Sequence, residues 1–425
     1  MALIADNRAG IVLNQAPSEE FRRVVKSFVG MRNWRLADGQ RNESPIELPG
    51  ADGVLIEVFR DSVDLTYHSA YFAARHTVRL NGASRGYRDR LPIDSDPVFT
   101  MTVSLSQLTA IAERREIFLN PSTPYDGLPV DPIDTSDIHW SILGNRETLR
   151  ALVRARRVLP KPSEYDRWGM NVVELARSED SDRALVHAAT PHYATQGECE
   201  CQWDPRGGNL CIEADVIQDA YKLHFRVKYA REGWLRAHRY GFLDGVGRRH
   251  RTTVMVGDSV WVADGYGPKY PDVRRMFSNV ECESSPSDWL EMDADNLVKA
   301  LEAAAKSMAA SKSNMAKLTL SCSQLGKSLE IRTNDDAPTV MPITLAYGNG
   351  PGSIHINPTQ LASLIKAVKR RSADSRVSLC WYAEDRPIRI TGMEGGALLM
   401  PMDPSAPDVN HKGKGRKRAT KRATK

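Results

Sequence analysis

The sequence predicts an α+β fold made of three similar units, each with two helices packed on short β-strands. Six amphipathic segments predict the helices, because apolar residues recur at intervals of three and four, as at Phe21, Val24 and Phe28. Alternating apolar and polar residues between these segments, as at Val54 and Ile56, predict half-buried strands. Two helices with a set of strands occur three times along the chain, which indicates a repeat architecture.

The six predicted helices are recognised by their apolar stripes and by the residues that precede them. Ser18, Ser104 and Asp293 are typical N-cap residues, so three of the helices are expected to begin there. The six helical segments span residues 18–32, 104–116, 144–159, 214–225, 293–308 and 357–371.

Turn-rich loops separate the three predicted units. The loops at 131–137 and 281–288 are rich in Asp, Ser and Pro, which favour turns. Residues 404–408, with two prolines, end the last unit. The expected domains are the segments 1–135, 136–285 and 286–405, followed by a basic tail at 406–425.

The composition is that of a soluble globular protein with two or three domains. The chain has 425 residues, of which 41% are hydrophobic and 26% are charged. No stretch approaches the roughly 18 apolar residues that a membrane helix needs. The first twenty residues lack the long apolar core of a signal peptide. We therefore expect a cytoplasmic location.

Positive charge is concentrated at the C-terminus. The formal net charge is +5, and residues 411–425 hold eight Lys or Arg and no acid, which leaves 5 − 8 = −3 for the rest of the chain. Such a tail is either a solvated solubility tail or a nonspecific contact with nucleic acid, because clustered cations displace counterions from phosphates.

The sequence offers no recognisable catalytic, metal or cofactor site. Of the six cysteines, only Cys199 and Cys201 are closely spaced, and no second pair lies at zinc-site spacing, so we expect reduced thiols and no metal. Walker, His-Glu-x-x-His and Gly-x-Ser-x-Gly motifs are absent. The glycines of 244–247 form a lone turn pattern, and the acidic residues of 334–336 follow a strand and indicate a turn.

The most specific pattern lies at the end of the last unit. Residues 353–402 read as a strand, an amphipathic helix and two strands, and the last strand runs into Met400-Pro401-Met402. This segment resembles the C-terminal end of the bacterial DNA sliding clamp, the β subunit of DNA polymerase III. In that family the last strand ends in a similar Met-Pro-Met or Met-Pro-Val motif.

Two further segments extend the resemblance. The sequence YPDVRRM at 270–276 resembles the Phe/Tyr-Pro-Asp-Tyr-Arg-Arg segment that precedes the third clamp domain. Residues 168–195 resemble the central strand pair, but Pro191 follows Ala-Thr where the family has Asp-Gly-His-Arg. Gln360 replaces a usual aromatic residue, the first domain is short after Arg115, and a tail follows the last strand. These departures suggest a divergent clamp with specialised partners, as would fit a phage or plasmid replication system.

The resemblance implies a non-enzymatic ring. In the family, two chains join head to tail as a homodimer, and the six-domain ring encircles double-stranded DNA with twelve helices inside. DNA polymerase and the clamp loader dock short linear motifs in a groove between domains 2 and 3. The groove residues that the resemblance implies here are Thr190, His192, Tyr270, Pro271, Arg275, Asn357, Leu398, Leu399, Met400, Pro401 and Met402. The alternating pattern also indicates that one of the two leucines is simply core.

Basic residues on the predicted helices are the candidates for DNA contact. A sliding protein needs cations that meet phosphates without a fixed register. Four arginines of the third helix recur at four- and three-residue spacing on one face, where they repel one another unless a polyanion is near. For any single one of the others, a solvated helix face is the favoured interpretation. The candidates are Arg22, Arg23, Lys26, Arg146, Arg150, Arg154, Arg157, Lys299, Lys306, Lys366, Lys369 and Arg370.

Two other functions remain open from the sequence. One is a nucleic-acid-binding protein that has a clamp-like fold and forms no ring. The other is a DNA-processing enzyme whose site the known motifs do not reveal.

Overall fold

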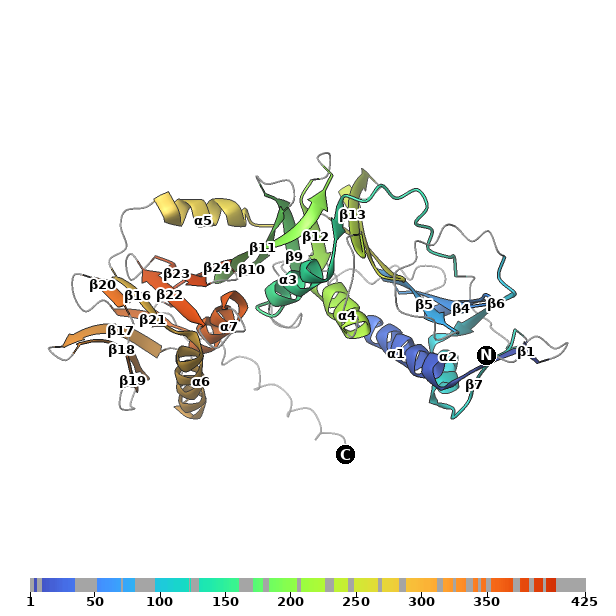
Figure 1. The fold of residues 1–425 in the computed structure, drawn as a ribbon, viewed down its shortest axis with the longest axis horizontal. Helices are drawn as coiled ribbons and strands as arrows, with labels where there is room; N and C mark the ends of the chain where they lie inside the picture. The colour runs from blue at the N-terminus through green and yellow to red at the C-terminus, as the bar shows by residue number, and fades with distance from the viewer. Residues whose placement is uncertain are drawn as a thin grey trace, which may run out of the picture. The chain divides into compact units, whose positions relative to one another are not determined.

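The computed structural model (Figure 1) contains helices and antiparallel sheets in two compact units. One unit comprises residues 1–190 and 196–271, and the other comprises 191–195 and 272–425. The residues that the structure describes are 4–5, 10–34, 52–69, 72–80, 96–121, 123, 130–159, 171–178, 183–204, 208–225, 233–243, 248–266, 270–282, 288–311, 316–323, 326–333, 339–342, 345–348, 353–369, 375–381, 386–392 and 395–402.

The described part of the larger unit holds two helix pairs and three sheets. Its elements are β1 (Ile4–Ala5), β2 (Gly10–Leu13), α1 (Gln15–Met31), β3 (Gly53–Val58), β4 (Ser62–His68), β5 (Phe72–Arg79), β6 (Phe99–Ser104), α2 (Leu105–Glu113), β7 (Ile117–Leu119), β8 (Ile142–Gly144), α3 (Arg146–Arg156), β9 (Val172–Arg177), β10 (Arg183–Ala189), β11 (Tyr193–Trp203), β12 (Leu210–Glu213), α4 (Ala214–His224), β13 (Leu235–Leu243), β14 (Arg248–Val256) and β15 (Ser259–Tyr266).

Strand pairing joins the two halves of this unit into one continuous sheet. The strands follow in the order β6-β3-β4-β5-β15-β14-β13-β8-β11, and all neighbours are antiparallel. The pairing of β5 with β15, which sets Ala74 opposite Trp261, links the first half to the second. Smaller sheets have the orders β1-β2-β7 and β10-β9-β12. The predicted boundary near residue 135 therefore lies inside one compact unit, and the three-domain division stays a prediction.

The smaller unit is also a mixture of helix and sheet. Its five-stranded sheet has the order β20-β16-β22-β23-β24 and its four-stranded sheet the order β19-β18-β17-β21. The elements are α5 (Val273–Cys282), β16 (Asp288–Asp293), α6 (Ala294–Ser311), β17 (Ala316–Ser323), β18 (Gly326–Arg332), β19 (Thr339–Pro342), β20 (Leu345–Gly348), β21 (Ser353–Ile356), α7 (Pro358–Val368), β22 (Arg376–Trp381), β23 (Ile388–Gly392) and β24 (Gly395–Leu399).

All six predicted helices are present, and they pack in pairs. The partners are α1 with α2, α3 with α4, and α6 with α7, and each pair lies within one unit (Figure 1). The apolar stripes explain this, because Phe21 and Phe28 of α1 are fully buried. A seventh helix, α5, forms in the segment that precedes the third predicted domain, where the sequence analysis predicted no helix.

Helix starts follow the predicted caps in two of three cases. Ser104 makes a capping box with Gln107, in which the two residues exchange backbone-to-side-chain hydrogen bonds of 3.2 and 2.8 Å. Asp293 Oδ1 accepts a hydrogen bond of 2.7 Å from the backbone N–H of Asn296. The prediction for Ser18 was wrong, because α1 begins at Gln15, three residues earlier. Pro17 needs no N–H partner in the first turn, and the Ser18 hydroxyl donates to the Leu13 carbonyl (2.9 Å).

A buried polar cluster holds the junction where β5 and β15 meet. The Ser27 hydroxyl of α1 donates to Oδ2 of Asp219 on α4 (2.5 Å), and Trp261 Nε1 donates to the same oxygen (3.1 Å). The ring of His76 stacks on Phe28 with centroids 5.2 Å apart and meets Trp261 edge-on at 5.1 Å. Burial lowers the pKa of His76 to about 3, with a second contribution from His224, and burial raises the pKa of Asp219.

Candidate functional site

The last strand, β24, separates two different environments in the smaller unit. Leu399 and Ala397 are completely buried on one face, where α7 packs against β24. Because side chains alternate along a strand, Leu398 projects from the opposite face, and it too is buried, with 3% of its surface exposed. The expectation that one of the two leucines is core is thus met by Leu399, while Leu398 is buried on the other face of the sheet.

Helix α5 covers the face of the sheet that carries Leu398. Val273, Phe277 and Val280 are buried along one stripe of this helix. Phe277 lies directly over Gly396, where an added Cβ would come within 3.1 Å of its ring. Asp272 caps the helix, because its Oδ1 accepts a hydrogen bond of 3.0 Å from the Arg275 backbone N–H. The segment YPDVRRM at 270–276 therefore leads into the start of a packed helix.

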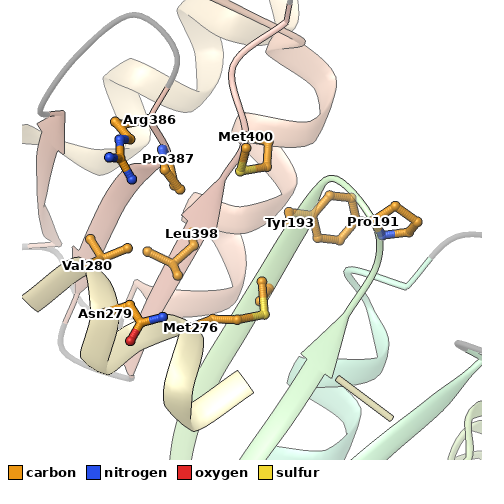
Figure 2. Close-up of a pocket in the computed structure, with 10 residues that line it drawn as sticks. Pro191, Tyr193, Met276, Asn279, Val280, Arg386, Pro387, Leu398 and Met400 are labelled. Atoms are coloured by element: carbon orange, nitrogen blue, oxygen red, sulfur yellow. The ribbon is translucent and has the colours of Figure 1, made fainter. Parts of the chain in front are cut away.

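A pocket of about 220 Å³ lies between α5 and the sheet (Figure 2). Figure 2 shows Met276, Asn279 and Val280 on the helix, close to Leu398. The volume is below the 300 to 1,000 Å³ of drug-sized pockets, so it fits one or two side chains of a peptide better than a cofactor. The ten lining residues, all in the smaller unit, are Pro191, Tyr193, Ala194, Met276, Asn279, Val280, Arg386, Pro387, Leu398 and Met400.

Backbone hydrogen bonds hold the two walls of the pocket that come from distant parts of the sequence. The Met400 N–H donates to the carbonyl of His192 (2.8 Å), which ties the segment 191–195 to the end of β24. The Met402 N–H donates to the carbonyl of His355 on β21 (2.9 Å). Met400 remains 39% exposed although it is apolar. A flexible, exposed thioether at the rim of an apolar pocket is suited to contact with a variable partner.

The structure brings only some of the predicted groove residues to this pocket. Leu398 and Met400 line it, whereas Leu399 lies in the core. Asn357 caps α7, because its Oδ1 accepts hydrogen bonds from Thr359 and Gln360 (3.0 and 3.2 Å). The predicted residues of the smaller unit that lie outside the lining are His192, Arg275, Asn357, Leu399, Pro401 and Met402.

Three predicted groove residues belong to the larger unit, namely Thr190, Tyr270 and Pro271. The half-buried Tyr270 packs against Val172 and Cys211 of that unit. Burial raises the pKa of its phenol well above the usual value, with further contributions from Cys211 and Glu174. The described packing of Tyr270 is therefore that of a residue held within the larger unit.

Most of the lining residues were missed in the sequence. The signal for Met276 and Val280 was present, since they recur with Val273 and Phe277 at three- and four-residue spacing. No local signal marks Tyr193 or Arg386, because only strand pairing brings their segments to β24.

The candidate cations on α1 and α3 differ in what they contact. Arg22 donates from Nε and Nη2 to the carbonyls of Ala112 (2.9 Å) and Arg114 (2.8 Å), so it holds the end of α2. Arg150 pairs with Glu147 one turn earlier, which lowers the repulsion expected within the arginine series. Lys26 and Arg157 are exposed, and the half-buried members are Arg23, Arg146 and Arg154.

On α6 and α7, lysines bridge the helix pair. Lys366 pairs with Glu302, and Lys369 pairs with Asp295. These hydrogen bonds lower the pKa of both carboxyl groups. Lys299 and Lys306 are exposed on α6, and Arg370 lies outside the described residues. The cations of this pair are thus partly neutralised by neighbouring acids.

The cysteines for which a state is described carry thiols. Cys199, Cys201 and Cys211 are buried, and Cys380 is half-buried. Burial raises the pKa of Cys211 to about 12 and that of Cys380 to about 11, which disfavours the reactive thiolate. Within the described part of the chain, no group of three or more His, Cys, Asp or Glu residues is arranged to hold a metal ion. No described helix is long and apolar enough to cross a membrane.

Comparison with known proteins identifies the fold. No protein-family model matches the sequence, and no curated protein does. The solved DNA polymerase sliding clamp from Bacillus subtilis matches with a TM-score of 0.65 at 11% identity, covering 93% of this chain and 100% of that chain. The β subunit from DNA polymerase of Streptococcus pyogenes matches with a TM-score of 0.61 at 14% identity, covering 93% of this chain and 100% of that chain. The Helicobacter pylori β clamp bound to a DNA ligase peptide matches with a TM-score of 0.62 at 10% identity, also covering 93% of this chain and 100% of that chain.

The chain therefore has the α+β fold of the bacterial sliding clamps over nearly its whole length. The resemblance inferred from three short segments is confirmed at the level of the fold.

Proposed function

We propose that this chain is a DNA sliding clamp, a non-enzymatic processivity factor that encircles duplex DNA and tethers replication proteins. The observation that carries the proposal is the match of the chain to complete clamp structures, which covers 93% of this chain and 100% of the clamp from Bacillus subtilis. In this proposal two chains form a closed head-to-tail homodimer in the cytoplasm, each with three clamp domains.

DNA contact is assigned to cations on the helices. The three helix pairs carry exposed Lys or Arg side chains on at least one member, as Lys26, Arg150 and Lys306 illustrate. Contacts of this kind neutralise phosphates without reading base edges, and so they allow sliding. The full proposed set is the twelve residues named in the sequence analysis. Among them, Arg22 has a structural duty as well, because it binds the end of α2.

Client docking is assigned to the pocket beside β24. A peptide from DNA polymerase or a clamp loader would place an apolar anchor against Leu398 and Met400. The Helicobacter pylori clamp was solved with a DNA ligase peptide, which supports peptide binding as a property of this fold. Burial of one or two anchor side chains yields about 1.5–3 kcal/mol each, and peptide ordering offsets part of it, so a modest affinity is expected.

Retention on circular DNA tests the ring. The chain is incubated with nicked plasmid circles at high protein concentration, so that rings open and reclose, and the DNA is then isolated in high salt. We expect protein to stay on the circles and to leave after a single restriction cut, because a ring slides off an end.

Sedimentation of the same sample distinguishes the alternatives. A dimer with topological retention supports the clamp. A monomer that binds circles and linear DNA equally would favour a nucleic-acid-binding protein without a ring. Cleavage of DNA with added Mg²⁺ or Mn²⁺ would favour an enzyme.

A further inference from the structure

A stripe of alternating charge runs along α6. Four charged residues recur at four- and three-residue spacing and so lie on one side of the helix, namely Asp295, Lys299, Glu302 and Lys306. The apolar face of α6 is a different one, because Leu301 is completely buried, whereas Glu302 and both lysines are exposed. The two acids and the two lysines thus form one outward-facing row.

Glu302 lies between two lysines that come from different helices. Lys366 of α7, which packs against α6, donates from Nζ to Oε1 of Glu302 (2.5 Å). This hydrogen bond and the charge of Lys366 lower the pKa of Glu302, and Lys306, one turn further along α6, adds to the effect. The side chains of Lys366 and Glu302 are 50% and 48% exposed, so ions from solution can reach the pair.

Asp295 has a similar position at the start of α6. Lys369 of α7 donates to its Oδ1, and the Ser375 hydroxyl donates to its Oδ2 (3.1 Å). The hydrogen bond from Lys369 lowers the pKa of Asp295, and Ser375 and the charges of Lys369 and Lys299 add to the effect. Because Ser375 is buried, Asp295 is anchored to the body of the unit, whereas Glu302 is held by an exposed pair.

The two acids lie beside every described lysine that is a candidate for DNA contact on this helix pair, namely Lys299, Lys306, Lys366 and Lys369. A phosphate that binds one of these lysines must displace a carboxylate or approach it closely. Exposed ion pairs are weak, so phosphate can displace them, but the loss of the pair offsets part of the gain. The affinity of the helix pair for phosphate is therefore set by the acids as well as by the lysines.

We infer that Asp295 and Glu302 determine how strongly α6 and α7 hold DNA, because each carboxylate competes with phosphate for two lysines. The inference rests on the proposed function, since it concerns the DNA contact of these helices. A lysine that exchanges between carboxylate and phosphate makes no contact of fixed register, which suits a protein that moves along the duplex. Removing an acid should therefore tighten the binding of DNA.

Binding of a short linear duplex to the full chain tests the inference. Affinity is measured by fluorescence anisotropy at several salt concentrations, because the slope of log K against log salt reports the number of phosphates contacted. The main variant is Glu302→Gln, which nearly keeps the size of the side chain and leaves the anchored Asp295 in place. The double variant adds Asp295→Asn, and circular dichroism checks that both variants are folded.

Two controls separate local competition from the change in net charge. Glu291→Gln with Glu330→Gln changes the net charge by as much as the double variant does, but it acts on β16 and β18, where these acids pair with arginines. Glu302→Gln in a chain that also carries Lys306→Ala and Lys366→Ala removes the acid after its two lysines have been removed.

We expect E302Q to bind the duplex about two- to fivefold more tightly and to steepen the salt slope by up to about 0.9 for each lysine released. The double variant should steepen the slope further, and both controls should keep the slopes of their parent proteins. An unchanged slope in E302Q, or an equal increase in the control E291Q/E330Q, would overturn the inference and leave DNA binding standing. Absence of duplex binding by the unchanged protein at every salt concentration would overturn the proposed function and the inference with it.

Discussion

The buried histidine at the junction of β5 and β15 should make the larger unit sensitive to acid. His76 is 1% exposed, and burial lowers its pKa to about 3, against 6.5 for the unperturbed side chain. The unfolded chain therefore binds a proton below pH 6.5 that the folded chain does not bind until the pH approaches 3. Because the unfolded state holds more protons in this range, the free energy of unfolding falls as the pH falls.

The size of the effect follows from the pKa values. Well below pH 6.5 each pH unit is worth about 1.4 kcal/mol, and lowering the pH from 6.5 to 4.5 should cost about 2.3 kcal/mol through this residue alone. That is a large fraction of the 5–15 kcal/mol that typically stabilises a folded domain. Asp219 has the opposite effect on the pH dependence of stability, because burial raises its pKa. This effect cancels in the comparison below, because both proteins carry Asp219.

The perturbation is His76→Phe, which removes the proton-binding group and keeps an aromatic ring between Phe28 and Trp261. Urea unfolding followed by near-ultraviolet circular dichroism at several pH values gives the free energy of unfolding for each protein. Between pH 6.5 and 4.5, the variant should lose about 2.3 kcal/mol less than the unchanged protein. His192→Phe, at an exposed position, is the matched control. Equal pH dependence of H76F and the unchanged protein would refute the reasoning.

Two further predictions follow from the helices. The double change Arg150→Glu and Arg154→Glu should reduce retention on nicked circles, because it replaces phosphate-binding charges on α3. The circular dichroism spectrum should stay the same. Unchanged retention would show that α3 does not contact DNA. Ser104→Ala removes the capping box of α2 and should lower the free energy of unfolding by about 1 kcal/mol, measured in urea; no change would show that the cap contributes nothing here.

The sequence by itself determined six of the seven described helices and several of the strands, because these depend on local periodicity. The apolar stripes of α1 and α7 and the cap at Ser104 are visible without any tertiary contact. The Met-Pro-Met segment and the tyrosine–proline segment also sufficed to indicate the clamp fold. The start of α1 was misplaced because Ser18 lies inside the first turns of the helix, where its buried hydroxyl donates to the Leu13 carbonyl instead of capping the helix.

The tertiary structure alone decided which residues form the pocket. Tyr193 and Arg386 lie almost half the length of the chain apart in sequence. Only the backbone hydrogen bond at Met400 and the packing of α5 bring their segments together. The faces of β24 were equally undetermined, since Leu398 and Leu399 are both apolar and both buried. Alternation along a strand separates such neighbours, but only the elements packed on each face determine which one meets the core and which one meets a ligand.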